Sequence, residues 1–87
     1  MTISVRQREI LVKTLELYIQ TGVPVGSNAL TDMVDASSST IRAELAVLEE
    51  KGLLTHPHTS AGRVPTDAGY RFYVDALMSG DESEDAE

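Results

Sequence analysis

The chain has 87 residues, a formal net charge of −7 and no cysteine. This length supports one compact module and leaves little room for the enclosed cleft of a large enzyme. The lack of cysteine excludes disulfides, thiolate zinc sites and cysteine nucleophiles, and it fits a reducing compartment. The longest apolar runs are only a few residues, so we expect neither a signal peptide nor a transmembrane helix.

The negative charge is concentrated at the C-terminus. Five of the fourteen acidic residues lie within 79–87, whereas residues 1–78 hold nine acidic and seven basic residues, a net charge of −2. A run of charges without large apolar side chains is typical of a disordered segment. We therefore expect a folded domain over 1–78 and an acidic disordered tail over 79–87. The nearly neutral body does not exclude DNA as a partner, although phosphate-binding surfaces are usually basic.

A first helix is predicted from about Ser4 to Thr21. Apolar residues recur there at helical spacing, namely Ile10, Leu11, Leu15, Tyr18 and Ile19. Ser4 and Gln7 have the spacing of a capping box, and Gly22 is typical of a helix end. Pro24 then favours an extended connector.

Two further helices are expected, separated by a polar turn. The second covers about 27–35, with Ser27 as its cap and an inward face of Ala29, Leu30, Met33 and Val34. After the turn, Ser37 or Ser38 can cap a third helix, whose inward residues at i, i+4 and i+7 are Ile41, Leu45 and Leu48.

A short ribbon and a fourth helix complete the pattern. Leu53–Thr55 begin an extended segment, and Val64 lies in the expected return strand. Thr66 and Asp67 cap the fourth helix, whose expected inward residues are Tyr70, Tyr73, Val74 and Leu77. Phe72 is expected on a different face, where it would suit a partner interface. The order of elements predicts a mainly α fold with a small β wing: a winged helix-turn-helix with a three-helix core, a two-stranded wing and a C-terminal helix.

The third helix carries the side chains expected to read DNA. When its apolar stripe faces inward, small residues such as Ala43 project outward and Arg42 lies on the flank. Small side chains let the helix approach the bases, and hydroxyl and guanidinium groups bind phosphates or base edges. We assign to this recognition helix Ser38, Ser39, Thr40, Arg42 and Ala43. The alternative for the same serines is an ordinary loop with a helix cap.

The loop after Pro57 supplies a second DNA-directed element. Its expected contacts are His58, Thr59, Ser60, Gly62 and Arg63. At the tip of a wing, an arginine can reach the DNA backbone or the minor groove, and a solvated surface charge is the alternative for Arg63. Further candidates for phosphate contacts are Arg6, Arg8, Ser27 and Arg71, for which exposed ion pairs are the alternative.

The sequence favours no metal, cofactor or catalytic centre. His56 and His58 are two residues apart, with no third ligand at zinc-binding spacing. Nothing in the pattern places a nucleophile, a base and an orienting acid together, so we do not expect an enzyme.

Several motifs resemble the N-terminal DNA-binding domain of the HrcA family of bacterial heat-inducible transcription repressors. The longest run extends from His58 to Asp67 and continues from Gly69 to Asp75. Shorter matches are Arg6–Leu11, Tyr18–Ile19, Gly22–Ser27, Ser39–Arg42, Leu48–Glu49 and Gly52–Leu54, so the resemblance covers about residues 4–78. It implies a repressor that binds, as a dimer, an inverted-repeat operator upstream of chaperone operons with the assistance of the GroE chaperonin. The family commonly has Asn where this chain has Ala43, which leaves the operator sequence open.

The portion that provides dimerisation and regulation in the family does not follow the fourth helix here. The chain is therefore expected to be either a DNA-binding fragment or a short stand-alone relative, with chaperonin dependence only if a regulatory domain exists. We expect a sequence-specific DNA-binding regulator that acts on double-stranded DNA as a homodimer, in the cytoplasm at the nucleoid. The alternative is a winged-helix module that binds another protein through Phe72, the fourth helix or the acidic tail.

Overall fold

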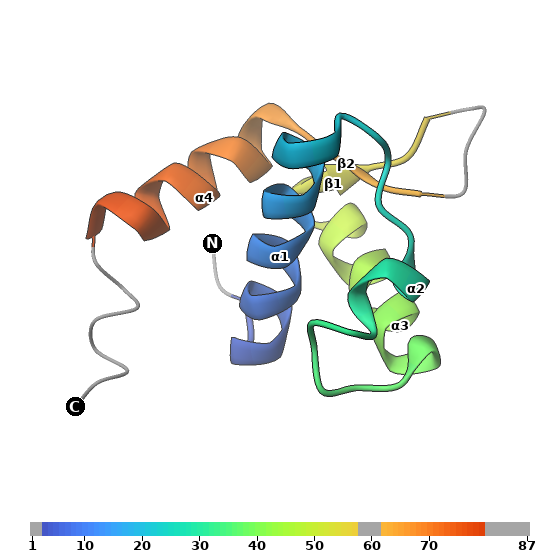
Figure 1. Cartoon of the computed structure of the whole chain (residues 1–87). Coiled ribbons are helices and arrows are strands. Elements are labelled where there is room, and N and C mark those ends of the chain that lie inside the picture. Colours follow the sequence, from blue (N-terminus) through green and yellow to red (C-terminus); the bar gives the residue numbers. More distant parts are fainter. Residues whose placement is uncertain (1–2, 58–61, 80–87) are drawn as a thin grey trace.

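The computed structural model describes residues 3–57 and 62–79 and has the element order expected of a winged helix (Figure 1). The elements are α1 (Val5–Thr21), α2 (Ser27–Leu30), α3 (Ser38–Glu50), β1 (Leu54–Thr55), β2 (Val64–Pro65) and α4 (Asp67–Ser79). The two strands are antiparallel, with Leu54 opposite Pro65 and Thr55 opposite Val64. The expected fold class is confirmed.

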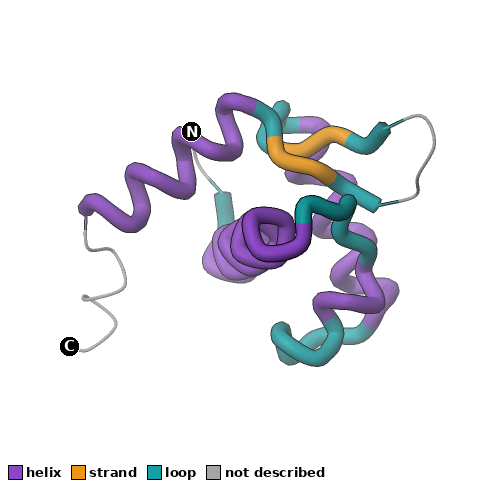
Figure 2. Tube along the Cα trace, turned by 45° about the horizontal axis from the view of Figure 1, so that its top comes forward, coloured by secondary structure: helices purple, strands orange, loops and turns teal. Residues whose placement is uncertain are grey.

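Helix α1 lies at the centre of the domain. It contacts α2 and α3 on one side and α4 on the other (Figures 1 and 2). The predicted capping box is present: the Ser4 hydroxyl accepts from the Gln7 amide at 3.0 Å, and the Gln7 side-chain carbonyl accepts from the Ser4 amide at 3.0 Å. Gly22, with φ 71°, ends the helix. None of the described helices is long and apolar enough to cross a bilayer.

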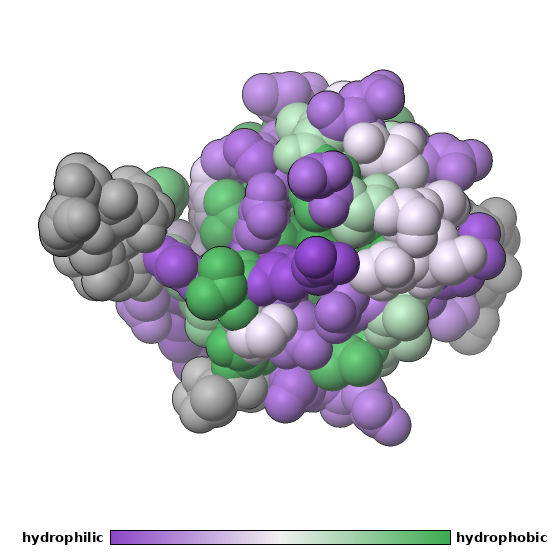
Figure 3. All heavy atoms as spheres, turned by 90° about the horizontal axis from the view of Figure 1, so that it is seen from below, coloured by the Kyte–Doolittle hydropathy of each residue, from purple (hydrophilic) through white to green (hydrophobic). Residues whose placement is uncertain are grey.

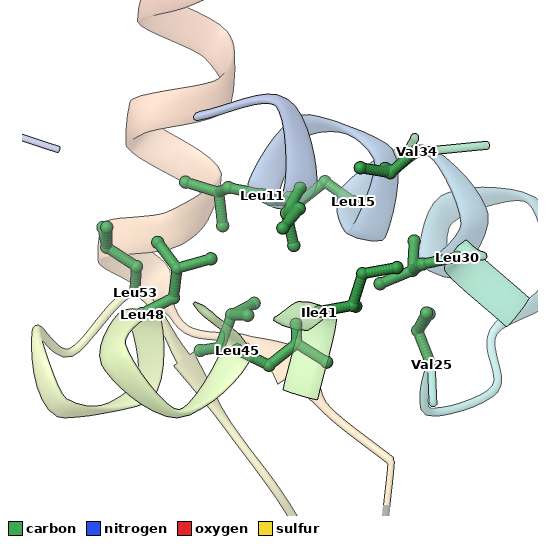
Figure 4. Close-up of a cluster of buried hydrophobic side chains, with 11 residues drawn as sticks. Leu11, Leu15, Val25, Leu30, Val34, Ile41, Leu45, Leu48 and Leu53 are labelled. Atoms are coloured by element: carbon green, nitrogen blue, oxygen red, sulfur yellow. The ribbon is translucent and has the colours of Figure 1, made fainter. Parts of the chain in front are cut away.

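The core is built almost entirely from aliphatic side chains. Side chains from α1, α2, α3 and the β1 region point toward one another in Figure 4, as predicted for Ile41, Leu45 and Leu48. The buried polar exception is Thr14, whose hydroxyl donates to the Ile10 carbonyl at 2.7 Å. Ile19, which the spacing places in the apolar stripe of this helix, lies outside the core and is 54% exposed. In the last turn of α1, Leu17 and Tyr18 pack against the core, and the helical rotation turns Ile19 outward.

The second helix is shorter than predicted. It ends at Leu30, and residues 31–36 form turns. The Thr31 hydroxyl donates to the Asn28 carbonyl at 2.8 Å, so it competes for an acceptor that a longer helix would use. Ser27 is not the cap, because Gly26 occupies that position without a side-chain hydrogen bond. Leu30 and Val34 are buried as expected, whereas Ala29 and Met33 are exposed.

Helix α4 is rotated relative to the prediction. Its inward residues are Gly69, Phe72, Tyr73 and Ala76, and those on its exposed side are Tyr70, Val74, Leu77 and Met78. Close packing at Gly69 sets this rotation, because a Cβ there would overlap the Leu53 carbonyl oxygen. Thr66 caps the helix as predicted, its hydroxyl accepting from the Gly69 amide at 3.1 Å. The expectation that Phe72 faces a partner is wrong, since its side chain packs against the core.

Candidate nucleic-acid interface

Helix α3 presents the outward face predicted for a recognition helix. Ser37 is its cap, and the Ser37 hydroxyl accepts from the Thr40 amide at 3.2 Å. With the apolar stripe of α3 buried in the core, Ser39, Arg42 and Ala43 are exposed. The helix therefore offers solvent a hydroxyl and a guanidinium group beside small residues, a combination that can lie in a major groove and donate to phosphates or base edges.

Helix α2 contacts the start of α3. The hydroxyl oxygens of Ser27 and Ser38 lie 3.4 Å apart, and both residues are half-buried. This contact places Ser27, predicted to bind phosphate, beside the first turn of the recognition helix. Thr40 is also half-buried, and its hydroxyl accepts from the Ser37 hydroxyl at 3.1 Å, so Thr40 takes part in the cap.

The described part of the wing is anchored at its root. Besides the pairing of β1 with β2, Val25 and Arg63 exchange two backbone hydrogen bonds of 2.8 Å each. Gly62 packs tightly on the connector before α2, because a Cβ there would lie 2.8 Å from the Pro24 carbonyl carbon. The other predicted wing contacts, His58, Thr59 and Ser60, lie outside the described residues.

The prediction that Arg63 projects from the tip of the wing is wrong. Its backbone lies at the wing root beside Val25, and its side chain is only 16% exposed. The Arg63 Nε lies 2.9 Å from Glu49 Oε1 in the last turn of α3, because the antiparallel ribbon brings the return strand back to that helix. The second oxygen of the same carboxylate, Glu49 Oε2, lies 2.8 Å from His56 Nδ1. Sequence reasoning missed Glu49, since no local spacing links it to either partner.

A hollow of about 540 Å³ joins the recognition helix, the start of α2 and the wing root. It is lined by four of the predicted DNA contacts: Ser27, Arg42, Gly62 and Arg63. Residues from three separate stretches of the sequence therefore meet on one surface. The exposed guanidinium group of Arg42 and the Ser27 hydroxyl can donate hydrogen bonds to a phosphate of a nucleic-acid backbone, whereas the Arg63 guanidinium is paired with Glu49.

The remaining candidate phosphate contacts do not gather at this hollow. Arg8 lines a cleft between α1 and α4, and Arg71 is exposed on α4 beside a separate shallow hollow of that helix. Arg6 is exposed in the first turn of α1. The structure thus brings together the contacts predicted on α2, α3 and the wing root, and it separates Arg8 and Arg71 from them.

A capped helix with an exposed polar face, preceded by a short helix and followed by an antiparallel ribbon, defines a winged helix-turn-helix domain of the DNA-binding class. Residues 2–76 match the family described as "Winged helix-turn-helix transcription repressor, HrcA DNA-binding". The chain belongs to this family.

Curated relatives named heat-inducible transcription repressor HrcA show the same relationship. The chain is 55% identical to the protein from Herpetosiphon aurantiacus over 73 residues, which are 84% of this chain and 21% of that protein. It is 57% identical to the protein from Nodularia spumigena over 76 residues, or 85% of this chain and 21% of the relative. It is 53% identical to that from Acetivibrio thermocellus over 79 residues, or 88% and 22%. The chain thus spans about a fifth of the length of these relatives.

One solved structure has the same fold. It is a crystal structure of a hypothetical protein at 2.2 Å resolution, with a TM-score of 0.85 and 39% sequence identity. The match covers 88% of this chain and 25% of that one. The similarity again lies within one part of a longer protein.

Proposed function

We propose that this chain is the DNA-binding domain of a heat-inducible transcription repressor. Its target is an inverted-repeat operator upstream of heat-shock or chaperone genes, on nucleoid DNA in the cytoplasm. Membership of the HrcA DNA-binding family supports the regulatory role. Assistance by a chaperonin is part of the proposal only for a chain that carries a regulatory domain.

The observation that carries the proposal is the common hollow of α2, α3 and the wing root. Arg42 is exposed on the outward face of α3, and it lines the same hollow as Ser27 and Arg63. A DNA strand whose phosphate occupies the hollow would lie beside the exposed N-terminal half of α3. We infer that Ser38, Ser39, Thr40, Arg42 and Ala43 face the major groove and that Gly62 and Arg63 approach the backbone.

Fluorescence anisotropy with two duplexes tests this function. One duplex contains the inverted repeat from the promoter of a chaperone operon, and the other is a scrambled duplex of equal length and composition. We expect the operator to bind at least about tenfold more tightly near physiological salt, with both affinities falling as salt increases. Equal affinities at every salt concentration would exclude specific recognition.

We further propose that two copies bind the inverted repeat through contacts between their α4 helices. Among the described residues, four of the eight large hydrophobic side chains classed as exposed lie on α4: Tyr70, Val74, Leu77 and Met78. We call these four exposed residues the α4 stripe. Arg71 lies between Asp67 and Asp75 at i−4 and i+4 on the same helix. Two α4 helices related by a two-fold axis can place unlike charges beside this stripe. A pair of helices this short buries less area than a stable dimer needs, so we expect the contact to form on DNA.

The same stripe favours a second candidate function, binding of another protein. Exposed apolar side chains grouped on one helix are typical of interaction sites. Figure 3, which views the molecule from below the view of Figure 1, shows that hydrophobic side chains also lie among hydrophilic ones on that face. Tyr70, Val74 and Leu77 replace Phe72 as the residues of interest, because Phe72 packs against the core. A pulled-down partner, together with no DNA binding after removal of residues 79–87, would favour this function.

A further inference from the structure

Glu49 joins the recognition helix to both sides of the wing. Its Oε1 lies 2.9 Å from Arg63 Nε, next to β2, and its Oε2 lies 2.8 Å from His56 Nδ1, next to β1. We propose that Glu49 is a positioning residue that fixes the wing relative to α3, so that both elements meet DNA in one geometry. This inference rests on the proposed DNA-binding function.

The described part of the wing is also held by backbone hydrogen bonds and by Leu54, which is buried in the core. The ribbon consists of two residue pairs, and its backbone bonds join β1 to β2 and Arg63 to Val25. These bonds fix the strands to each other and to the connector before α2. The Glu49 carboxylate adds a side-chain link to the recognition helix itself. Because the Arg63 side chain is 16% exposed and that of Glu49 is 29% exposed, the pair is shielded from most of the solvent.

A carboxylate beside a DNA-binding wing is not explained by attraction to phosphates. Glu49 repels the DNA backbone and neutralises Arg63, a residue that lines the candidate phosphate hollow. If charge alone mattered, removal of the carboxylate would strengthen binding to every sequence, with a steeper salt dependence. If Glu49 positions the wing, its removal weakens binding to the operator, because a misdirected wing loses contacts that only the specific complex makes. The two explanations predict opposite signs for operator affinity.

The test compares Glu49→Gln with Glu50→Gln in the full 87-residue chain. Both substitutions remove one negative charge from the last turn of α3, and Glu50 is exposed. Anisotropy titrations use the operator and the scrambled duplex at three salt concentrations, with circular dichroism to confirm folding. We expect Glu49→Gln to lower operator affinity about fivefold or more while scrambled affinity stays equal or rises. Glu50→Gln should change both affinities by the same small factor. Operator affinity that rises equally in the two variants would overturn the proposal.

A readout without DNA separates this proposal from the proposed function. Amide hydrogen exchange in free Glu49→Gln should accelerate at Arg63, whose amide donates to the Val25 carbonyl, and at Val64 in the ribbon, and remain unchanged in the middle of α1. Glu49→Asp keeps the charge and should restore part of the protection. Unchanged wing exchange in Glu49→Gln would overturn the positioning role, even if the wild-type chain binds its operator. Accelerated wing exchange together with equal wild-type affinity for both duplexes would support the positioning role and reject specific DNA recognition.

Discussion

Gly69 in the first turn of α4 packs directly against the backbone carbonyl of Leu53, so closely that a Cβ would overlap the carbonyl oxygen. The same carbonyl accepts from the Thr66 amide at 3.2 Å. The residue just before β1 therefore fixes both the position and the rotation of α4. With Gly69 inward, Phe72 and Tyr73 follow on the inward side, and the stripe that contains Val74 faces solvent.

We expect Gly69→Ala to destabilise the domain by about 1–3 kcal/mol, because the added methyl group forces α4 away from Leu53. Alanine is the better helix former, so the intrinsic preference of the helix has the opposite sign. The free energy of unfolding is measured by urea denaturation. Gly26→Ala is the control, since its Cβ would meet nothing within 4 Å and its cost as a cap residue should stay below about 1 kcal/mol. A Gly69→Ala protein as stable as the wild type would contradict the close packing.

The contrast between α3 and α4 shows which parts of the fold the sequence predicts. Helix α3 was predictable because its cap and its apolar stripe are local signals, and both Ser37 and Leu45 behave as expected. The rotation of α4 was not, because its apolar residues are spread around the helix and the contact that selects one face joins Gly69 to a carbonyl sixteen positions earlier. The same distinction holds for Arg63. Local sequence signals place Arg63 in the wing segment, whereas its pairing with Glu49 depends on how the ribbon folds back toward α3.

The Ser37 cap provides a test that separates stability from binding. Ser37→Ala removes the acceptor for the Thr40 amide and should cost about 1 kcal/mol of unfolding free energy. Ser39→Ala changes an exposed residue of the same helix and should alter stability by less than about 0.5 kcal/mol. If Ser39 contacts DNA as proposed, Ser39→Ala should lose operator affinity and Ser37→Ala should not, under conditions where both proteins are folded. Urea denaturation and anisotropy on the two variants give the answer, and equal stability losses would contradict the role of Ser37.

Arg42 is the side chain on which specific recognition is expected to depend most. Because it is exposed, Arg42→Ala should leave the unfolding free energy almost unchanged, yet weaken operator binding by about 1–3 kcal/mol. Lys13→Ala removes the same charge from α1, where Lys13 lines the cleft toward α4 and not the hollow beside α3, and should reduce both operator and scrambled affinity only slightly. The ratio of operator to scrambled affinity therefore distinguishes the two variants. Equal ratios in Arg42→Ala and the wild type would mean that Arg42 contributes charge without reading sequence.

The exposed stripe of α4 predicts cooperativity between two copies on one operator. Val74→Glu places a charge in the stripe, where Val74 is 48% exposed in the free domain. Folding should be retained, because no core contact is lost. Binding to a single half-site should fall only by the small factor that one added negative charge causes, whereas binding to the complete inverted repeat should lose its cooperativity.

Ile19→Glu is the matched control for this experiment, since Ile19 is 54% exposed on α1 and lies outside the stripe. Titrations of half-site and full-site duplexes, with analytical ultracentrifugation of the complexes, measure how many copies bind and how tightly. Both variants carry the same added charge, so any difference between them on the full site reports the α4 contact. If Val74→Glu and Ile19→Glu behave alike on both duplexes, the two copies do not meet through α4, and the stripe is then left for the binding of another protein.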